Sequence, residues 1–370
     1  MKNLRKPHKQ FTLNGKSFEN GKELLTFSKI VSNTVHSFLR TWFDDSDAIA
    51  VSTSGSTGKP KIIYLKKEYM VNSALATGAY FKIFEDTKAL LCLSPDYIAG
   101  KMMLVRAIVL GWQLDIVEPT SNPLAFTKKS YDFCAMVPLQ VENSLNELYK
   151  IKKVLVGGAP VSTQLIAKIK DVPTEVFATY GMTETITHIA VKRLNHHQHT
   201  ASGFPAPPKT HTLKEPYFNV LPTVKISTDP RNCLVIDAPK VSDKQIITND
   251  IVELVSDTKF RWLGRYDTVI NSGGIKLIPE LIEKKLAQLI KQRFFVAGIS
   301  DEQLGEKLVL IIENKNNILN KKYIQDLNSQ LSTLNSLDKY EVPKTIYTVK
   351  QFVETPTKKI QRQQTLDLIF

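Results

Sequence analysis

Segments of helical character alternate with segments of strand character between residues 67 and 178. Helices are predicted at 67–82, 102–110 and 161–170, and the apolar composition of 102–110 indicates a buried helix. Short apolar runs predict the strands, at 89–93, 113–117, 133–137, 154–156 and 175–178. This alternation is typical of an α/β fold, in which helices cover both faces of a mostly parallel sheet. Ligands bind such sheets at the loops that follow the strands.

Further helices, strands and loops are predicted before and after this α/β region. An amphipathic helix is expected over 20–43, and two strands at 47–51 and 62–65 flank a polar loop. The run His196-His-Gln-His199 lies in a stretch rich in Pro, Ser and Thr, and we interpret it as a loop rather than a zinc site. The short strands that follow predict a β-rich subdomain, at 220–226, 233–238, 246–250 and 251–254, with a turn between the last two.

The last hundred residues repeat the α/β pattern on a smaller scale. Helices are expected at 279–291 and 322–334, and strands at 294–298, 307–313 and 344–350. A segment of this length suffices for an independent domain. We therefore predict a large domain over residues 1–266 and a small α/β domain over residues 267–370.

The chain is strongly basic. It has 370 residues, and 49 Lys and Arg residues outnumber 36 Asp and Glu residues, which gives a net charge of +13. A basic protein can bind nucleic acid, a membrane surface or small anionic molecules. The basic residues are dispersed and form no nucleic-acid motif, so we expect small anionic substrates and no nucleic-acid partner.

The cysteine spacing and the apolar runs indicate in which cellular compartment the protein is expected. Cys92, Cys134 and Cys233 are far apart in the sequence, which suits free thiols in a reducing compartment. The apolar run at 102–110 contains Arg106 and is too short to cross a bilayer. We therefore expect a cytoplasmic protein without stable membrane insertion. Its oligomeric state stays open, a homodimer included.

The polar loop between the first two strands has the composition of a phosphate-binding loop. Glycines let the backbone turn its N–H groups towards one point, while hydroxyls and lysines add donors and positive charge. The spacing differs from the nucleoside-triphosphate loop, which has two glycines five positions apart. Taken alone, the composition also fits a surface linker. The candidate phosphate-binding residues are Thr53, Ser54, Gly55, Ser56, Thr57, Gly58, Lys59 and Lys61.

Two later polar loops follow predicted strands. Gly157-Gly-Ala-Pro160 is either a wall of a binding site or a plain strand-to-helix turn. Thr179-Tyr-Gly-Met-Thr-Glu-Thr185 combines an aromatic ring, a glycine, hydroxyls and a carboxylate. A carboxylate beside bound phosphate is useful where it holds a cation, and Mg²⁺ on phosphate takes one or two carboxylates. Glu184 is therefore the candidate metal ligand.

Two of these motifs resemble signatures of the acyl-adenylate-forming superfamily, which includes acyl-CoA synthetases, peptide-synthetase adenylation domains and luciferases. The loop 53–61 resembles its phosphate loop, and Tyr180-Gly-Met-Thr-Glu184 matches its Tyr-Gly-x-Thr-Glu motif. The resemblance implies an enzyme that uses ATP and Mg²⁺ and whose two domains are joined by a hinge. It implies catalytic roles for Thr183 and Glu184. It also implies that adenine contacts Gly157, Gly158, Ala159, Pro160, Tyr180 and Gly181.

Three further segments extend the resemblance. Asp250 matches a family aspartate that binds the ribose hydroxyls, although Asn249 replaces the glycine that usually precedes it. The segment 262–276 implies that Arg265 also reaches the ribose and that Asp267 is the hinge. The same segment implies that Gly273 and Gly274 contact the pantetheine arm of coenzyme A.

The third segment, Thr355-Pro-Thr-Lys-Lys-Ile-Gln-Arg362, resembles the family's Thr-x-x-Gly-Lys-Ile-x-Arg motif. The resemblance implies that Lys359 is the catalytic lysine. Lys358 stands where glycine is usual, so it remains a competing assignment. Without the other motifs, this segment would fit a basic C-terminal face.

The segment Tyr97-Ile-Ala-Gly-Lys-Met-Met103 and the following Arg106 are similar to short bacterial o-succinylbenzoate–CoA ligases of menaquinone biosynthesis. The phosphate loop begins near residue 53, so the resemblance implies a shortened N-terminal domain. It also implies that an aromatic or dicarboxylic acid is joined to AMP and then to coenzyme A.

Tyr97, Lys101 and Arg106 are candidate acid-binding residues, and either cation could instead be a surface or structural charge. Two alternatives stay open: an enzyme that loads an acid onto a carrier-protein thiol, and a non-catalytic nucleotide-binding protein.

Overall fold

The structure is a computed structural model that describes residues 6–52, 61–195, 217–315, 319–355 and 359–370. Its largest element is a 13-stranded sheet. The parallel centre of this sheet contains β6 (Gln113–Ile116), β5 (Lys88–Leu91), β7 (Tyr131–Met136), β8 (Ile151–Val156) and β9 (Glu175–Gly181). The strands read as continuous apolar runs because both faces of this part of the sheet are covered.

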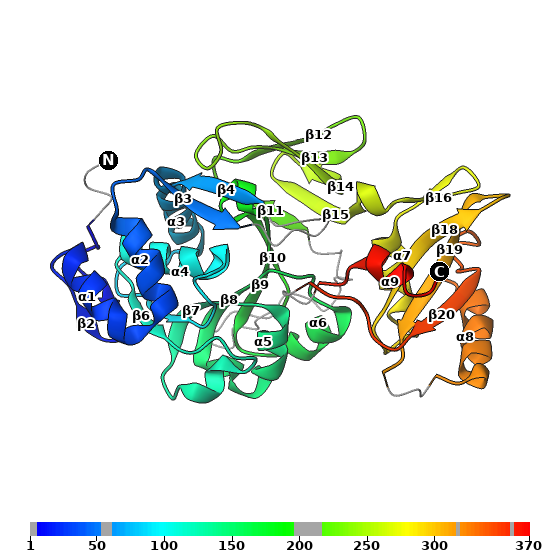
Figure 1. Cartoon of the computed structure of the whole chain (residues 1–370), viewed down its shortest axis with the longest axis horizontal. Coiled ribbons are helices and arrows are strands. Elements are labelled where there is room, and N and C mark those ends of the chain that lie inside the picture. The colour runs from blue at the N-terminus through cyan, green and yellow to red at the C-terminus, as the bar shows by residue number, and fades with distance from the viewer. Residues whose placement is uncertain (1–5, 53–60, 196–216, 316–318, 356–358) are drawn as a thin grey trace, which may run out of the picture.

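Antiparallel strands continue the sheet beyond β9, in the order β10 (His188–Arg193), β11 (Phe218–Val220), β15 (Lys259–Arg265), β14 (Ile246–Ser256), β13 (Cys233–Asp237) and β12 (Lys225–Thr228). At the opposite edge, β1 (Thr12–Leu13) pairs in parallel with β6 and is followed by β2 (Lys16–Ser17). The sheet therefore ends in β12 on one side and β2 on the other (Figure 1).

Helices surround the sheet (Figure 1). They are α3 (Lys67–Phe81), α4 (Ile98–Leu110), α5 (Pro138–Asn143) and α6 (Thr163–Ile169), with 3₁₀ turns η2 (Pro123–Phe126), η3 (Leu145–Lys150), η4 (Thr183–Thr185) and η5 (Tyr266–Thr268). α4 is buried along most of its length, as its apolar sequence predicts. It begins earlier than expected, because Ile98 to Lys101 already form its first turn.

The N-terminal helical segment is two helices, so the prediction of one helix over 20–43 is wrong. α1 (Gly21–Val31) and α2 (Asn33–Phe43) are separated by Ser32, which has an extended backbone with φ −166° and ψ 138°. Ser, Asn and Thr at positions 32 to 34 favour helix starts over helix interiors, because their side chains compete for backbone hydrogen bonds. The apolar period continues across the break because both helices pack on the main core.

The predicted strand pair around the polar loop is confirmed. β3 (Ala48–Ser52) and β4 (Ile62–Lys66) pair antiparallel, with Ser52 opposite Ile62. The loop residues Thr53 to Pro60 lie outside the described residues. α3 starts directly after β4, so the hairpin leads straight into this helix.

Two predictions in the β-rich part are wrong. The expected strand 220–226 is split between β11 and β12 by a turn in which Thr223 has φ +73°. The expected turn within 246–254 is absent, because β14 runs unbroken through Asn249 and Asp250. Its pairing with β15 shifts register after Ile251, which is the irregularity that replaces the turn.

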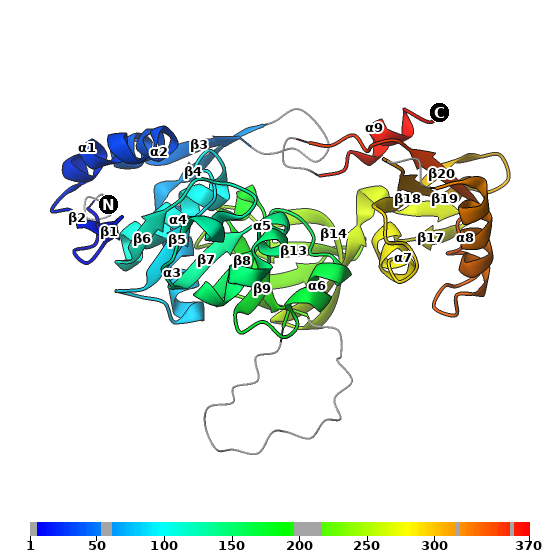
Figure 2. The same ribbon diagram turned by 90° about the horizontal axis from the view of Figure 1, so that it is seen from below.

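Residues from 270 onwards form a separate five-stranded sheet. Its strands are β16 (Ile270–Ser272), β17 (Ile275–Leu277), β18 (Phe294–Asp301), β19 (Gly305–Glu313) and β20 (Thr345–Val349), and its helices are α7 (Pro279–Leu286), α8 (Lys321–Thr333) and α9 (Arg362–Leu366). Two apolar clusters lie on this sheet, one including Ile282 and Leu327 and the other including Phe295 and Leu366. This part stands beside the main sheet (Figure 2). The two parts meet where α7 contacts β15.

Among the described residues, no helix has both the length and the apolar character that a membrane span requires.

Gly100 offers a test of the packing of α4. A Cβ built at this position would lie 2.3 Å from the carbonyl oxygen of Ser94, a backbone atom that cannot move freely. We expect Gly100→Ala to lower the free energy of unfolding by about 1–3 kcal/mol despite the higher helix propensity of alanine. Urea denaturation measures this loss.

Gly78→Ala in α3 is the matched control. Its nearest neighbour would be the end of the Leu110 side chain at 2.9 Å, which can rotate away. If Gly78→Ala lowers the free energy of unfolding as much as Gly100→Ala does, or more, the proposed clash at Gly100 is contradicted.

Candidate nucleotide and acid site

Asp250 is the centre of the polar cluster that the fold assembles. Its carboxylate is buried and accepts hydrogen bonds from the Tyr180 hydroxyl at 2.6 Å and from the indole N–H of Trp262 at 3.0 Å. Tyr180 comes from the end of β9, Asp250 from β14 and Trp262 from β15. Burial, together with the negative charge of Asp250, strongly raises the pKa of Tyr180. The phenol therefore stays protonated and acts as a donor.

Arg265 connects this cluster to Asp267. One guanidinium nitrogen lies 3.5 Å from Asp250 Oδ1, and two others donate to Asp267 Oδ1 and Oδ2 at 3.0 and 3.1 Å. Hydrogen bonding to Asp267 raises the pKa of Arg265. Burial favours the protonated form of Asp267, but hydrogen bonds and charge from Arg265 outweigh it and lower the pKa of this carboxyl. Both side chains therefore remain charged.

The two glycine-containing loops lie side by side at the ends of β8 and β9, where Val156 pairs with Ala178. At Gly157, a Cβ would lie 2.5 Å from the Thr179 hydroxyl, and Gly158 has φ +82°. At Gly181, a Cβ would lie 2.2 Å from the Thr187 carbonyl oxygen. A larger residue at Gly157 would push the two loops apart, and one at Gly181 would displace the backbone at Thr187. Ala159 and Pro160 are exposed.

Thr183 and Glu184 lie in η4, directly after this β9 loop. Glu184 is exposed, and η4 contacts β4, the second strand of the polar-loop hairpin. Lys61 is the described residue of that loop. The other candidates lie outside the described residues, namely Thr53, Ser54, Gly55, Ser56, Thr57, Gly58 and Lys59. The fold thus brings Glu184 to the hairpin that carries the loop.

The C-terminal segment brings Lys359 within electrostatic range of this cluster. Burial lowers the pKa of Lys359, and the positive charge of Arg265 lowers it further. Its backbone N–H donates to the Thr355 hydroxyl at 3.0 Å. Arg362, one turn further on, donates to Glu283 at 3.0 Å and so ties the segment to α7. Lys358 lies outside the described residues.

Gly273 and Gly274 form the two-residue turn between β16 and β17. Both have positive φ, +59° and +82°, as a tight hairpin turn with two left-handed residues requires. The turn is exposed. A role in coenzyme A binding stays a prediction.

The three candidate acid-binding residues have different surroundings. Tyr97 is exposed at the start of α4. The Lys101 ammonium donates to the carbonyl oxygens of Pro95 and Asp96, at 2.5 and 2.9 Å. Arg106 is only 2% exposed and donates to the hydroxyls of Thr77 and Thr187, at 3.3 and 3.2 Å. Burial lowers the pKa of Arg106 to about 10.

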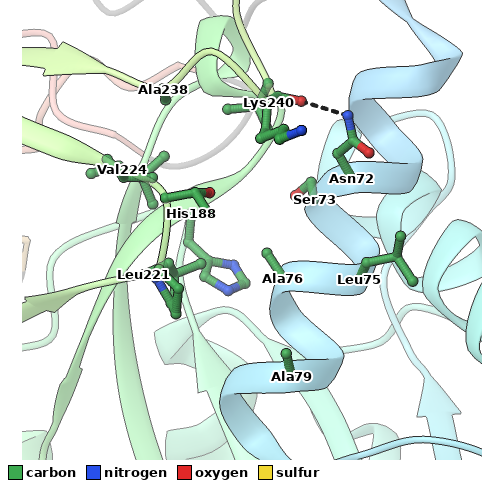
Figure 3. A pocket seen from close by; sticks show the side chains of 14 residues that line it. Asn72, Ser73, Leu75, Ala76, Ala79, His188, Leu221, Val224, Ala238 and Lys240 are labelled. Atoms are coloured by element: carbon green, nitrogen blue, oxygen red, sulfur yellow. Dashed lines mark hydrogen bonds between the residues drawn. The ribbon is translucent and has the colours of Figure 1, made fainter.

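A cavity of about 320 Å³ lies between α3, β10 and the turns of the β-rich part (Figure 3). Its wall includes Asn72, Ser73 and Ala76 from α3, His188 from β10, and Lys240. His188 was not among the predicted site residues. The available signal was its position as a polar residue in an apolar strand, three residues after the polar loop that ends at Thr185.

Comparison with known proteins places the chain in a family. Residues 6–222 match the family described as AMP-binding enzyme. The 2-succinylbenzoate–CoA ligase of Bacillus cytotoxicus is 25% identical over 352 residues, which cover 86% of this chain and 69% of that relative.

Two solved structures are also similar. An acyl-CoA synthetase (AMP-forming)/AMP-acid ligase II-like protein from Dyadobacter fermentans is 36% identical, with 95% of this chain and 99% of that chain covered and a TM-score of 0.58. The o-succinylbenzoate coenzyme A synthetase from Bacillus subtilis, in complex with ATP and a magnesium ion, is 17% identical, with 94% and 82% covered and a TM-score of 0.66. The predicted α/β fold class is confirmed by this likeness. The chain therefore belongs to the AMP-binding enzyme family, as one of its AMP-forming acid–CoA ligases.

Proposed function

We propose that the protein is an o-succinylbenzoate–CoA ligase of menaquinone biosynthesis. The observation that carries the proposal is the meeting of three sequence motifs at one buried carboxylate, because Tyr180 and Arg265 both contact Asp250. The fourth motif brings Lys359 into the range at which the charge of Arg265 lowers its pKa. The substrate named for the Bacillus cytotoxicus relative, 2-succinylbenzoate, supports the choice of acid. The solved o-succinylbenzoate coenzyme A synthetase from Bacillus subtilis is in complex with ATP and a magnesium ion, which supports ATP and magnesium as ligands of this protein.

In the first step, an oxygen of the acid's carboxylate attacks the α-phosphorus of ATP. A new C–O–P link forms, the bond to the β-phosphate breaks, and pyrophosphate leaves with the electron pair. Lys359 would neutralise negative charge that grows between carboxylate and phosphate, and Thr183 would donate a hydrogen bond to the α-phosphate. Asp250 keeps lone pairs for the ribose hydroxyls while Tyr180 and Trp262 hold its orientation.

Glu184 fits the role of a magnesium ligand. It is an exposed carboxylate on a 3₁₀ turn against the hairpin of the polar loop, and oxygen donors of this kind suit Mg²⁺ on phosphate. When bound, the ion would neutralise phosphate charge. The sequence places the hydroxyls and lysines of residues 53–61 at the same hairpin.

In the second step, the thiol of coenzyme A attacks the acyl carbon, the thioester forms, and AMP leaves. We propose that the part from residue 267 onwards rotates about Asp267 between the steps, withdraws Lys359 and presents Gly273 and Gly274 to coenzyme A. The boundary between residues 266 and 267 belongs to this proposal. The separate small sheet supports it, because that sheet has apolar clusters of its own.

Among the acid-binding candidates, Arg106 is favoured over Lys101. Lys101 already donates to two backbone carbonyl groups, whereas Arg106 is a buried cation whose described partners are neutral hydroxyls. A buried positive charge favours an anionic ligand nearby. A dicarboxylic acid would supply one. The buried state of Cys92, Cys134 and Cys233 is in keeping with a cytoplasmic location, which we also propose.

Pyrophosphate release tests the proposed reaction directly. With ATP, Mg²⁺ and a panel of acids, 2-succinylbenzoate should release the most pyrophosphate, and added coenzyme A should then yield its thioester. Both products are measured by coupled assay and mass spectrometry. If no acid gives pyrophosphate, the proposed ligase activity is refuted. If pyrophosphate is released but no coenzyme A thioester forms, a carrier-protein thiol is favoured as the acceptor.

Replacing Lys359 tests whether this lysine acts in adenylation and not in thioester formation. We expect Lys359→Ala to slow adenylation by about 100-fold or more, because one charge contact to the transition state is lost. Thioester formation from supplied acyl-adenylate should be largely spared. Lys358→Ala is the matched control, and normal adenylation by Lys359→Ala with loss in Lys358→Ala would move the role to Lys358.

The surroundings of Lys359 also predict a pH effect. Its ammonium loses its proton as pH rises through a pKa that burial and Arg265 set below the ordinary 10.5. Adenylation should therefore fall on the alkaline side before free lysine would titrate, as seen in a pH profile of kcat. Lys359→Arg should remove this fall, since arginine keeps its charge. A profile that is unchanged in Lys359→Arg would assign the fall to another group.

A further inference from the structure

The cavity at His188 is bounded by elements that the nucleotide motifs also use. α3 follows directly from β4 of the polar-loop hairpin, and β10 follows η4, which carries Thr183 and Glu184. On the sheet, His188 pairs with Gly181 of the adenine motif. A molecule in this cavity would therefore lie one strand away from the residues proposed to bind ATP.

His188 presents an unused polar atom to this space. The side chain is 6% exposed, and its Nε2 has no hydrogen-bond partner among the residues that the structure describes. In Figure 3 the ring extends from β10 towards Ala76 of α3. The other wall residues include the apolar side chains of Ile189, Leu221 and Val224. A buried polar atom at an apolar cavity is costly unless a ligand pairs with it.

A chain of hydrogen bonds at the other ring nitrogen favours one tautomer of His188. Arg106 donates to the Thr187 hydroxyl oxygen at 3.2 Å, and the same hydroxyl lies 3.1 Å from His188 Nδ1. Arginine can only donate, so the hydroxyl hydrogen is free to be directed at Nδ1. Nδ1 is then the acceptor, and Nε2 carries the ring hydrogen. The cavity therefore meets an N–H donor rather than an acceptor.

The charges around this chain favour an anion. Among the described residues, Arg106 donates hydrogen bonds to the neutral hydroxyls of Thr77 and Thr187, and Lys240 contributes a second cation to the cavity wall. Burial lowers the pKa of His188 well below its usual value, and the charge of Arg106 lowers it further, so the ring is a neutral donor. A carboxylate at Nε2 would accept a hydrogen bond from a ring whose other nitrogen is linked through Thr187 to the buried guanidinium of Arg106.

We propose that this cavity binds the non-reacting end of the acid substrate and that the Nε2–H of His188 donates to its second carboxylate. Arg106 is then a positioning residue, which acts through Thr187. The apolar wall takes the body of the acid, and the reacting carboxylate points towards the nucleotide residues. The inference rests on the proposed ligase function and adds the residue that selects dicarboxylic acids.

Binding of two acids separates this inference from the ligase reaction. The probes are 2-succinylbenzoate and 4-oxo-4-phenylbutanoate, which lacks the ring carboxylate. Calorimetric titration of the full-length protein, with a non-hydrolysable ATP analogue present, should give about 10-fold or tighter binding of the first, as expected for a charged hydrogen bond. His188→Leu should abolish this difference. His36→Leu, at a histidine that contacts Ser28 instead, should keep it.

Three further variants test the cavity and the hydrogen-bond chain from Arg106 through Thr187 to His188. Ala76→Leu fills the cavity and should weaken binding of both acids while ATP binding is unchanged. Thr187→Val breaks the link to Arg106 and should reduce the preference, whereas His188→Gln, which keeps an N–H donor, should retain part of it.

An unchanged preference in His188→Leu would overturn the inference. Equal affinity of the wild-type protein for the two acids, or binding of neither, would overturn it as well. If the inference fails in this way, pyrophosphate release with an acid that has one carboxylate would still support the ligase reaction. Failure of the His188 inference can therefore be distinguished from failure of the proposed function.

Discussion

The buried carboxylate of Asp250 is the constraint on which the proposed site depends. A charge removed from water must be compensated, and here a phenol, an indole and a guanidinium from two other strands converge on it. Tyr180, Trp262 and Arg265 are therefore held in fixed positions by electrostatics as well as by packing. Because Arg265 also holds Asp267, the same carboxylate fixes the segment that leads into the second sheet.

Sequence patterns predicted the structure correctly where the composition of a short segment matches its surroundings in the fold. The strands β5 to β9 were predictable because buried parallel strands are continuous apolar runs, and Asp250 and Lys359 were proposed as site residues through family motifs. The break at Ser32 was missed because the apolar period continues across it. The unbroken course of β14 was missed because Asn249-Asp250 has the composition of a turn, whereas here the pairing of β13 and β15 on either side holds it extended.

His188 shows why a site is harder to predict than a fold. Its neighbours Thr187 and Arg106 are near in space, but Arg106 lies 81 residues earlier in the chain than Thr187. The cavity also needs α3 and the turns of the β-rich part, which meet through contacts such as that of Asn72 with the Lys240 carbonyl at 2.9 Å. No local pattern contains this information, because the polar groups become partners only after the sheet has formed.

The ends of the main sheet determine how copies of the protein can meet. β2 has two residues and carries Lys16, and β12 has four residues and carries Lys225. Short edges with a charged side chain offer few free backbone groups to a strand from another molecule. Despite its 13 strands, the sheet is therefore poorly suited to grow by edge-to-edge addition. Copies that met through this sheet would have to use its side-chain surfaces, and its strand edges act as barriers against aggregation.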